Sequence, residues 1–266
     1  MNAIGKKRLC IDLSRYVNEF TTTTKLRIKS TVQFLQVVKE GAYMYAFDLK
    51  SAYHQIEMFR EHWRFLGLSV NMEGVKKFFV FTCLPFGLND AARALTKLMR
   101  FPLQRCREWG ARAFIHLADG IGAVTGKKEA EEMAGRVKKD LARFGLITSE
   151  EKCIWEVTQE MEWTGWLINT KDFMIYVTER KIVKAEQRLD QLLAKMGKNV
   201  RVKELSSLVG LIISFGLDVV RSARFYKRFS TIKVARVAEE KGWEAYLVLP
   251  VEVVAELRYW KKNLRI

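Results

Sequence analysis

The chain has 266 residues, 49% hydrophobic and 29% charged, which suits a globular fold and excludes an intrinsically disordered one. Lysine and arginine outnumber aspartate and glutamate by 46 to 30, and the net charge of +16 favours nucleic acid as a partner over a merely soluble basic surface. The longest apolar run, Leu205–Leu217, is too short and interrupted to span a bilayer, and no signal peptide opens the chain. We therefore expect an intracellular protein of the nucleus or cytoplasm.

Apolar periodicity and turn residues predict alternating strands and helices in the first 178 residues. Asn89 is a good N-cap for a helix running to about Glu108, which Pro102 should kink or interrupt. Gly145 should end the next helix. In chain order we expect strands at Arg8–Leu13 and Tyr43–Leu49, a hairpin of Phe65–Val70 and Lys77–Thr82 with its turn at Asn71–Gly74, the helix from Asn89, a hairpin of Ala113–Leu117 and Ile121–Val124, the helix Lys128–Phe144, and strands at Cys153–Val157, Glu162–Ile168 and Phe173–Val177.

The pattern changes near residue 178. From Glu179 onward, apolar residues recur at helical spacing and basic residues take the other faces. Further helices are predicted at Lys203–Leu217 and Val251–Leu264. We expect one domain of mixed helix and strand over residues 1–178 and a helical domain over residues 179–266.

The dipeptide Asp119-Gly120 lies between two apolar runs and predicts a hairpin, since glycine tolerates positive φ. The surrounding order of strand, helix, hairpin, helix and strand is the split βαβ arrangement. That layout places the end of the strand with Asp48 beside the strand end after Ile115–Leu117, so Asp48 and Asp119 should face one point. Converging carboxylates are the oxygen ligands that Mg²⁺ requires, although an Asp at a strand end is also an ordinary turn residue.

Five segments resemble, in the expected order, the motifs of retroelement reverse transcriptases, and in particular those of retrotransposon enzymes such as the DIRS-type elements. They are Tyr45–Ile56 for motif A, Leu84–Arg93 for motif B, Phe114–Gly120 at the place of motif C, Gly145–Cys153 for motif D and Glu162–Ile168 for the primer-grip hairpin. The resemblance implies an α+β right-hand polymerase fold. Residues 1–178 would hold partial fingers and a split-βαβ palm, and residues 179–266 a helical thumb and the start of the connection.

The resemblance also implies roles for single residues, each with an ordinary structural alternative such as a core aromatic, a tight turn or a solvated charge. The implied partners are a primer–template duplex of RNA and DNA and a deoxynucleoside triphosphate. Asp48 and Asp119 would be catalytic carboxylates and metal ligands for Mg²⁺, or for Mn²⁺, and Lys152 would lie near the leaving pyrophosphate. Arg8 would bind the triphosphate, Tyr53 would be the steric gate against a 2′-hydroxyl, Phe86 and Gly87 would shape the nucleotide floor, and Gly165 and Trp166 would hold the primer.

Motif C departs from the family at one decisive position. The family has tyrosine, any residue, Asp and Asp, whereas this chain has His116, Leu117, Ala118 and Asp119. Ala118 stands where the lost metal ligand is expected, and a methyl group cannot coordinate a cation. We therefore expect weak or single-site metal binding and impaired catalysis. We expect the loss of one ligand to lower the rate by a factor on the order of a thousand or more.

Three histories are compatible with Ala118: an introduced substitution, a decayed element, or a domesticated module that binds nucleic acid or protein without catalysis. The sequence does not rank them. It predicts a polymerase core that binds primer–template, with the non-catalytic binding module as the alternative function.

Overall fold

The computed structural model describes residues 11–14, 17–22, 24–26, 31–215 and 225–265. The chain divides into two compact units, one made of residues 1–164 and 168–174 and the other of residues 165–167 and 175–266. The predicted strand at Arg8–Leu13 falls largely outside the described residues, and its described part, 11–13, is not a strand. Among the described residues, no helix is both long and apolar enough to cross a membrane.

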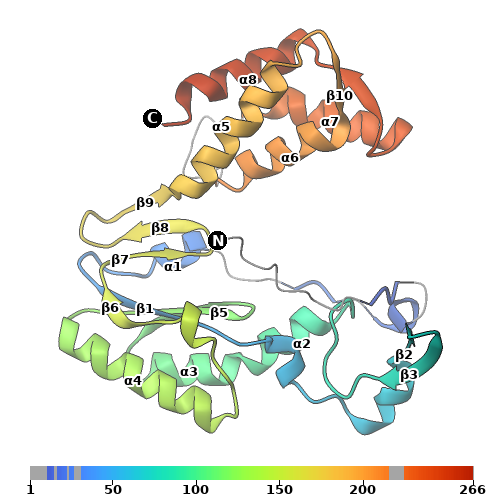
Figure 1. Cartoon of the computed structure of the whole chain (residues 1–266). Coiled ribbons are helices and arrows are strands. Elements are labelled where there is room, and N and C mark those ends of the chain that lie inside the picture. Colours follow the sequence, from blue (N-terminus) through green and yellow to red (C-terminus); the bar gives the residue numbers. More distant parts are fainter. Residues whose placement is uncertain (1–10, 15–16, 23, 27–30, 216–224, 266) are drawn as a thin grey trace. The chain divides into compact units, whose positions relative to one another are not determined.

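A four-stranded sheet organises the first unit (Figure 1). Its strands are β1 (Tyr43–Asp48), β4 (Arg112–His116), β5 (Asp119–Val124) and β6 (Ile154–Thr158), in the spatial order β4-β5-β1-β6. Strand β5 is antiparallel to both β1 and β4, so it separates the two strands that the intervening helices connect. This is the predicted split βαβ arrangement. The neighbour of β1 is therefore β5, and not the end of β4 as the sequence suggested.

Helices cover one face of this sheet (Figure 1). They are α3 (Arg100–Glu108) and α4 (Lys127–Arg143), and their buried residues, together with those of α2 (Ala91–Leu98), join those of β1 in one core. The predicted helix from Asn89 is interrupted at Met99 because the ring of Pro102 clashes with the carbonyl four residues earlier. As predicted, α4 ends before Gly145, which has a φ of 73°.

Two glycines bring β5 close to the aromatic residues of β1. A Cβ on Gly120 would lie 2.2 Å from the ring of Phe47, and one on Gly122 would lie 2.2 Å from the ring of Tyr45. The hairpin at this place was predicted, but for a reason that is wrong in detail. Asp119 and Gly120 belong to β5, the turn consists of Leu117 and Ala118, and the positive φ of 56° falls on Leu117.

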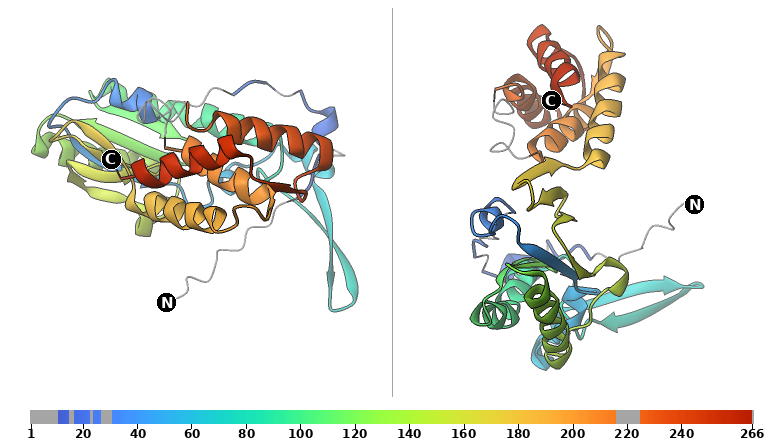
Figure 2. Two further views of the ribbon diagram at one scale, coloured as in Figure 1. Left: turned by 90° about the horizontal axis from the view of Figure 1, so that it is seen from above. Right: turned by 90° about the vertical axis from the view of Figure 1, so that its left-hand side faces the viewer.

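A second hairpin projects from the same unit (Figure 2). Its strands are β2 (Gly67–Met72) and β3 (Val75–Val80), joined by a two-residue turn in which Glu73 and Gly74 both have positive φ, as a tight hairpin requires. All residues of both strands except Leu68 are exposed. The remaining short elements of this unit are η1 (Val17–Phe20), α1 (Thr31–Leu35), η2 (Ala52–Gln55), η3 (Arg60–Phe65) and η4 (Glu150–Lys152).

The boundary between the units falls within the strands that follow β6. The predicted strand Glu162–Ile168 is two strands, β7 (Glu160–Trp163) and β8 (Trp166–Asn169), separated by the turn of Thr164 and Gly165. Strand β9 (Met174–Val177) completes the order β7-β8-β9.

The second unit is mainly helical (Figure 2). It has its own apolar core. The predicted helices are present as α5 (Glu179–Leu193), α6 (Val202–Ile213) and α8 (Val251–Asn263). The sequence reading missed α7 (Arg228–Lys241) and the pair of short strands β10 (Asn199–Arg201) and β11 (Tyr246–Val248). Glu256 of α8 is buried and accepts hydrogen bonds of 2.8 Å from the backbone N–H groups of Phe229 and Ser230, at the start of α7.

Candidate functional site

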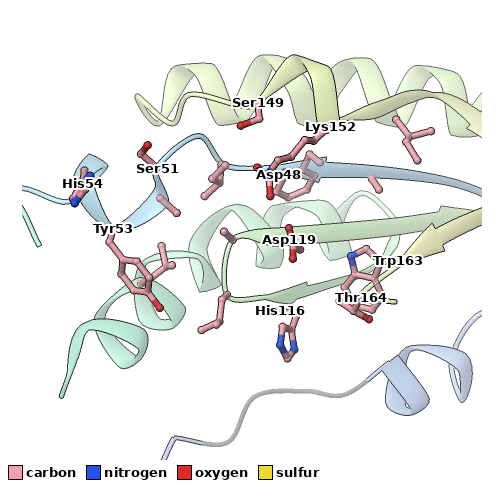
Figure 3. A pocket seen from close by; sticks show the side chains of 18 of the residues that line it. Asp48, Ser51, Tyr53, His54, His116, Asp119, Ser149, Lys152, Trp163 and Thr164 are labelled. Carbon is pink, nitrogen blue, oxygen red and sulfur yellow. Dashed lines mark hydrogen bonds and ion pairs between the residues drawn. The ribbon is translucent and has the colours of Figure 1, made fainter. Parts of the chain in front are cut away.

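A cavity of about 760 Å³ opens in the first unit at the end of β1 (Figure 3). Five segments converge on it: the end of β1 with η2, α2 with the turn before it, the β4–β5 hairpin, the loop that contains η4 with the start of β6, and the end of β7. The candidate residues that line it are Asp48, Tyr53, Phe86, Ala118, Asp119 and Lys152.

Asp48 and Asp119 lie directly opposite each other in the β1–β5 register, so their side chains are on the same face of the sheet. Their carboxyl groups share a hydrogen bond. Burial, this hydrogen bond and the charge of Asp48 together raise the pKa of Asp119 to about 6. Near that pH, the two carboxyls hold one proton between them, as paired carboxylates at close range do.

Lys152 provides the positive charge beside this pair. Its Nζ lies 3.1 Å from Oδ1 of Asp48. Burial raises the pKa of Asp48, but the hydrogen bonds from Asp119 and Lys152 and the charge of Lys152 outweigh it, so the pKa is lowered overall. Asp48 is 16% exposed and Lys152 50%, so the ammonium group remains accessible to solvent while it neutralises the carboxylate.

The backbone of the Lys152 loop (Gly145–Lys152) is hydrogen-bonded to the end of β1. Ser149 donates its N–H to the carbonyl of Asp48 at 2.8 Å, and a hydrogen bond from its side chain contributes to the low pKa of Asp48. The N–H of Asp48 points at Sγ of Cys153 at 3.5 Å. Sequence reasoning missed both contacts, although the two residues flank Lys152 in the motif D segment.

Ala118 occupies the second position of the two-residue turn between β4 and β5. Its carbonyl accepts the N–H of Leu49 at 3.1 Å, so a main-chain hydrogen bond holds the turn against the end of β1, and the side chains of Leu117 and Ala118 pack against the apolar core. Within the described part of the chain, no group of three His, Cys, Asp or Glu residues is arranged to hold a metal ion. Asp48 and Asp119 supply oxygen donors suited to one hard cation, but they are too few for the pair of ions in a two-metal centre.

An aromatic group forms another wall of the cavity. The rings of Tyr53 and Phe86 meet edge to face with centroids 4.9 Å apart, and His54 contacts Phe86 at 5.3 Å. Burial raises the pKa of the Tyr53 hydroxyl. His54 lines the cavity but was not singled out from the sequence, where it looked like one residue of motif A among many.

The turn after Phe86 depends on Gly87. Its φ is 104°, and a Cβ would lie 2.2 Å from the carbonyl oxygen of Ile11. Asn18 fixes this turn from outside: its Nδ2 donates to the Gly87 carbonyl at 2.8 Å, and its Oδ1 accepts the N–H of Asn89 at 3.0 Å. The backbone around Phe86 is thus held by groups distant in sequence.

The predicted primer-grip residues Gly165 and Trp166 belong to the second unit. There Lys181 lies over the Trp166 ring at 5.0 Å and donates to the Ser214 carbonyl at 3.1 Å. Among the basic residues of this unit, Arg201 and Lys203 form ion pairs with Glu244. Arg8, predicted to bind the triphosphate, lies outside the described residues.

Residues 1–168 match the family described as reverse transcriptase (RNA-dependent DNA polymerase). The chain belongs to the reverse transcriptase family. A comparison with curated proteins found no match. The structure of this reverse transcriptase domain is similar to solved structures of the foamy viral protease-reverse transcriptase.

Comparison with the complex that contains an RNA/DNA hybrid gives a TM-score of 0.71 at 17% sequence identity. The match covers 95% of this chain and 31% of the foamy viral chain. With one complex with double-stranded DNA, the TM-score is 0.67 at 16% identity, covering 93% and 39%. With another, it is 0.65 at 16% identity, covering 93% and 47%. The chain therefore spans less than half the length of these relatives and has their α+β right-hand polymerase fold.

Proposed function

We propose that this reverse transcriptase domain binds a primer–template duplex of RNA and DNA and that its addition of deoxynucleotides is impaired. The observation that carries the proposal is the turn at Ala118. A methyl group lies beside Asp48 and Asp119, and although Glu162 also lines the cavity, the described residues contain no group of three acidic, His or Cys side chains arranged to hold a metal ion. Without a third acidic ligand, two divalent ions cannot both be held, and transition-state stabilisation is lost.

Two observations support binding of a duplex. The similar foamy viral enzymes were solved with double-stranded DNA and with an RNA/DNA hybrid. The net charge of +16 favours phosphate backbones. We place fingers and palm in residues 1–178, and thumb and the start of the connection in residues 179–266. Gly165 and Trp166 would then hold the primer, and the element of origin would be a retrotransposon.

Around the nucleotide, the roles follow the lining of the cavity. Tyr53 and Phe86 would form the surface under the sugar and base, with Gly87 shaping its floor, and Arg8 would bind the triphosphate. Lys152 would stabilise the charge of the leaving pyrophosphate, once released from Asp48. Asp48 and Asp119 would hold one Mg²⁺, or Mn²⁺, which supplies Lewis-acid stabilisation of the phosphate when bound.

Primer extension tests the proposal directly. The original chain and Ala118→Asp would be compared with Mg²⁺ and with Mn²⁺, and Asp48→Asn in the Ala118→Asp background would serve as the inactive control. We expect little or no extension by the original chain and a gain on the order of a thousandfold in Ala118→Asp. Primer extension at equal rates by the original chain and by Ala118→Asp would show that catalysis is not impaired by Ala118.

A non-catalytic binding module is the second candidate, and Ala118 also favours it. In that case Ala118→Asp would bind duplex but would remain inactive. The salt dependence of duplex binding decides whether basic residues contact the phosphate backbone. Each phosphate contact releases counterions, which makes the logarithm of the binding constant fall more steeply with the logarithm of salt concentration. A flat slope would rule out duplex binding for both candidates and leave a protein partner.

A further inference from the structure

The side chain of Gln55 forms a reciprocal pair of hydrogen bonds with one residue of the Lys152 loop. Its Nε2 donates to the carbonyl of Ile147 at 2.9 Å, and its Oε1 accepts the N–H of Ile147 at 2.8 Å. The same Nε2 also donates to the carbonyl of Lys50. An amide that satisfies both backbone groups of a residue acts as one rung of a β-ladder.

This rung extends a run of backbone contacts that leads to Lys152. The carbonyl of Ile147 also accepts the N–H of Lys50 at 2.9 Å, and Ser149 donates to Asp48 at 2.8 Å. Three residues after Ser149, the ammonium group of Lys152 reaches Asp48. The Ile147 side chain is 61% exposed, so apolar packing of this residue does not hold the loop in place. Leu146 anchors the start of the loop in the apolar core, and polar contacts set the position of the segment from Ile147 to Lys152.

Gln55 also belongs to the element that carries Tyr53. Both lie on the single 3₁₀ turn η2, which begins at Ala52. Tyr53 faces the cavity against Phe86, whereas Gln55 reaches the loop 92 residues later in the chain. One short turn thus connects the aromatic wall with the loop that positions the lysine.

We infer that Gln55 is a positioning residue: its amide fixes the loop Gly145–Lys152 on the end of β1 and so places the Lys152 ammonium beside Asp48. The consequence for nucleotide addition rests on the proposed function, whereas the consequence for the loop does not. A chain without this amide keeps the fold but lets Lys152 leave the cavity.

Amide hydrogen exchange on the full chain tests the placement of the loop. In Gln55→Leu, the amides of Ile147 and Ser149 should exchange roughly ten to a hundred times faster, since two to three hydrogen bonds of about 1 kcal/mol are lost. Gln55→Glu keeps the acceptor for the Ile147 N–H but not the donor, and should be intermediate. Gln104→Leu, the same change at an exposed hydrogen-bonded site on α3, should leave the loop unchanged.

Exchange of the α4 amides shows whether Gln55→Leu is still folded. Unchanged protection there, together with faster exchange at Ile147, supports the inference. Equal exchange at Ile147 in Gln55→Leu and the original chain overturns it. If Gln55→Leu unfolds, Gln55→Glu decides in its place, through exchange of the Lys50 amide, which donates to the Ile147 carbonyl. Faster exchange of that amide supports the inference, and unchanged exchange overturns it.

Single-turnover nucleotide addition in the Ala118→Asp background tests the consequence for Lys152. Adding Gln55→Leu should lower the rate about tenfold with primer–template affinity unchanged, and Gln55→Glu should recover part of the loss. An unchanged rate overturns the positioning role. If Ala118→Asp adds no nucleotide at all, the proposed function fails, and hydrogen exchange alone decides the role of Gln55.

Discussion

Asp119 lies across from Asp48 in the register of β5 with β1, and the two carboxyls share a hydrogen bond beside the ammonium group of Lys152. Two carboxyl groups and one ammonium group thus lie together. Near pH 6 the two carboxyls hold one proton between them, so the pair carries about one negative charge beside the positive charge of Lys152. This balance determines how the domain should respond to pH, to metal ions and to a carboxylate introduced at position 118.

Asp119→Asn should stabilise the domain at high pH. The folded-state pKa of Asp119 is raised to about 6 from 3.8, so the folded state binds more protons between these values and loses stability as the pH rises through them. Asn mimics the protonated acid and can still donate to Asp48. We expect about 1 to 2 kcal/mol of added stability at about pH 8, after allowance for solvent screening, and no gain at about pH 4. Urea unfolding at both pH values checks this, and a loss at high pH contradicts it.

Magnesium should stabilise Ala118→Asp more than the original chain. Without metal, the third carboxylate should lower the stability of the variant by about 1 kcal/mol, because like charges converge. With about 10 mM Mg²⁺, the melting temperature of the variant should rise by about 2 °C or more, and that of the original chain by less than about 1 °C. Differential scanning calorimetry with Asp48→Asn as the control measures both. Equal shifts in the two chains would show that Ala118 is not a lost ligand position.

Gly122→Ala should destabilise the first unit severely. A Cβ at this position would lie 2.2 Å from the ring of Tyr45, which is fully buried and cannot move aside. We expect a loss of about 2 to 4 kcal/mol. Gly135→Ala on α4 is the matched control, since nothing lies within 4 Å of its Cβ and alanine favours a helix by about 1 kcal/mol. Denaturant unfolding should give changes of opposite sign, and two similar values would count against the close packing of β5 on Tyr45.

Glu256→Gln should loosen the start of α7. The buried Glu256 carboxylate accepts one backbone N–H group on each of its oxygens. The amide of glutamine has only one acceptor oxygen, and its NH₂ group would face the second backbone N–H group. We expect a loss of about 1 to 3 kcal/mol in the free energy of unfolding. Glu252→Gln, one turn earlier and exposed, should change it by less than about 0.5 kcal/mol. Equal effects in thermal unfolding would argue against the cap.

Much of the sheet could be predicted from the sequence because its signals are local. The alternating aromatics of Tyr43–Asp48, the two apolar runs around Asp119 and the glycine after α4 each specify an element without help from distant residues. The helix α7 was missed because only Ser230, Val234 and Val237 of its residues are buried, which leaves a weak helical period. Strands of three residues, such as β10, are too short to show a period at all.

The candidate site was predictable in its membership but not in its contacts. Motif resemblance selected Asp48, Asp119 and Lys152, and the structure brings all three to one cavity. The ion pair of Lys152 with Asp48 joins residues 104 positions apart, and no local pattern signals such a pair. Arg8 remains a prediction, and the roles of Gly165 and Trp166 remain proposals about the second unit.

The turn at Leu117 and Ala118 is closed by main-chain atoms, since the Ala118 carbonyl accepts the Leu49 amide and the strands on either side pair in full register. The main chain therefore closes the turn, and the side chain of Ala118 adds one partly buried contact with the apolar core. A turn closed in this way keeps its place through hydrogen bonds that do not involve the side chain at position 118, so that residue can be exchanged while the framework around it stays assembled.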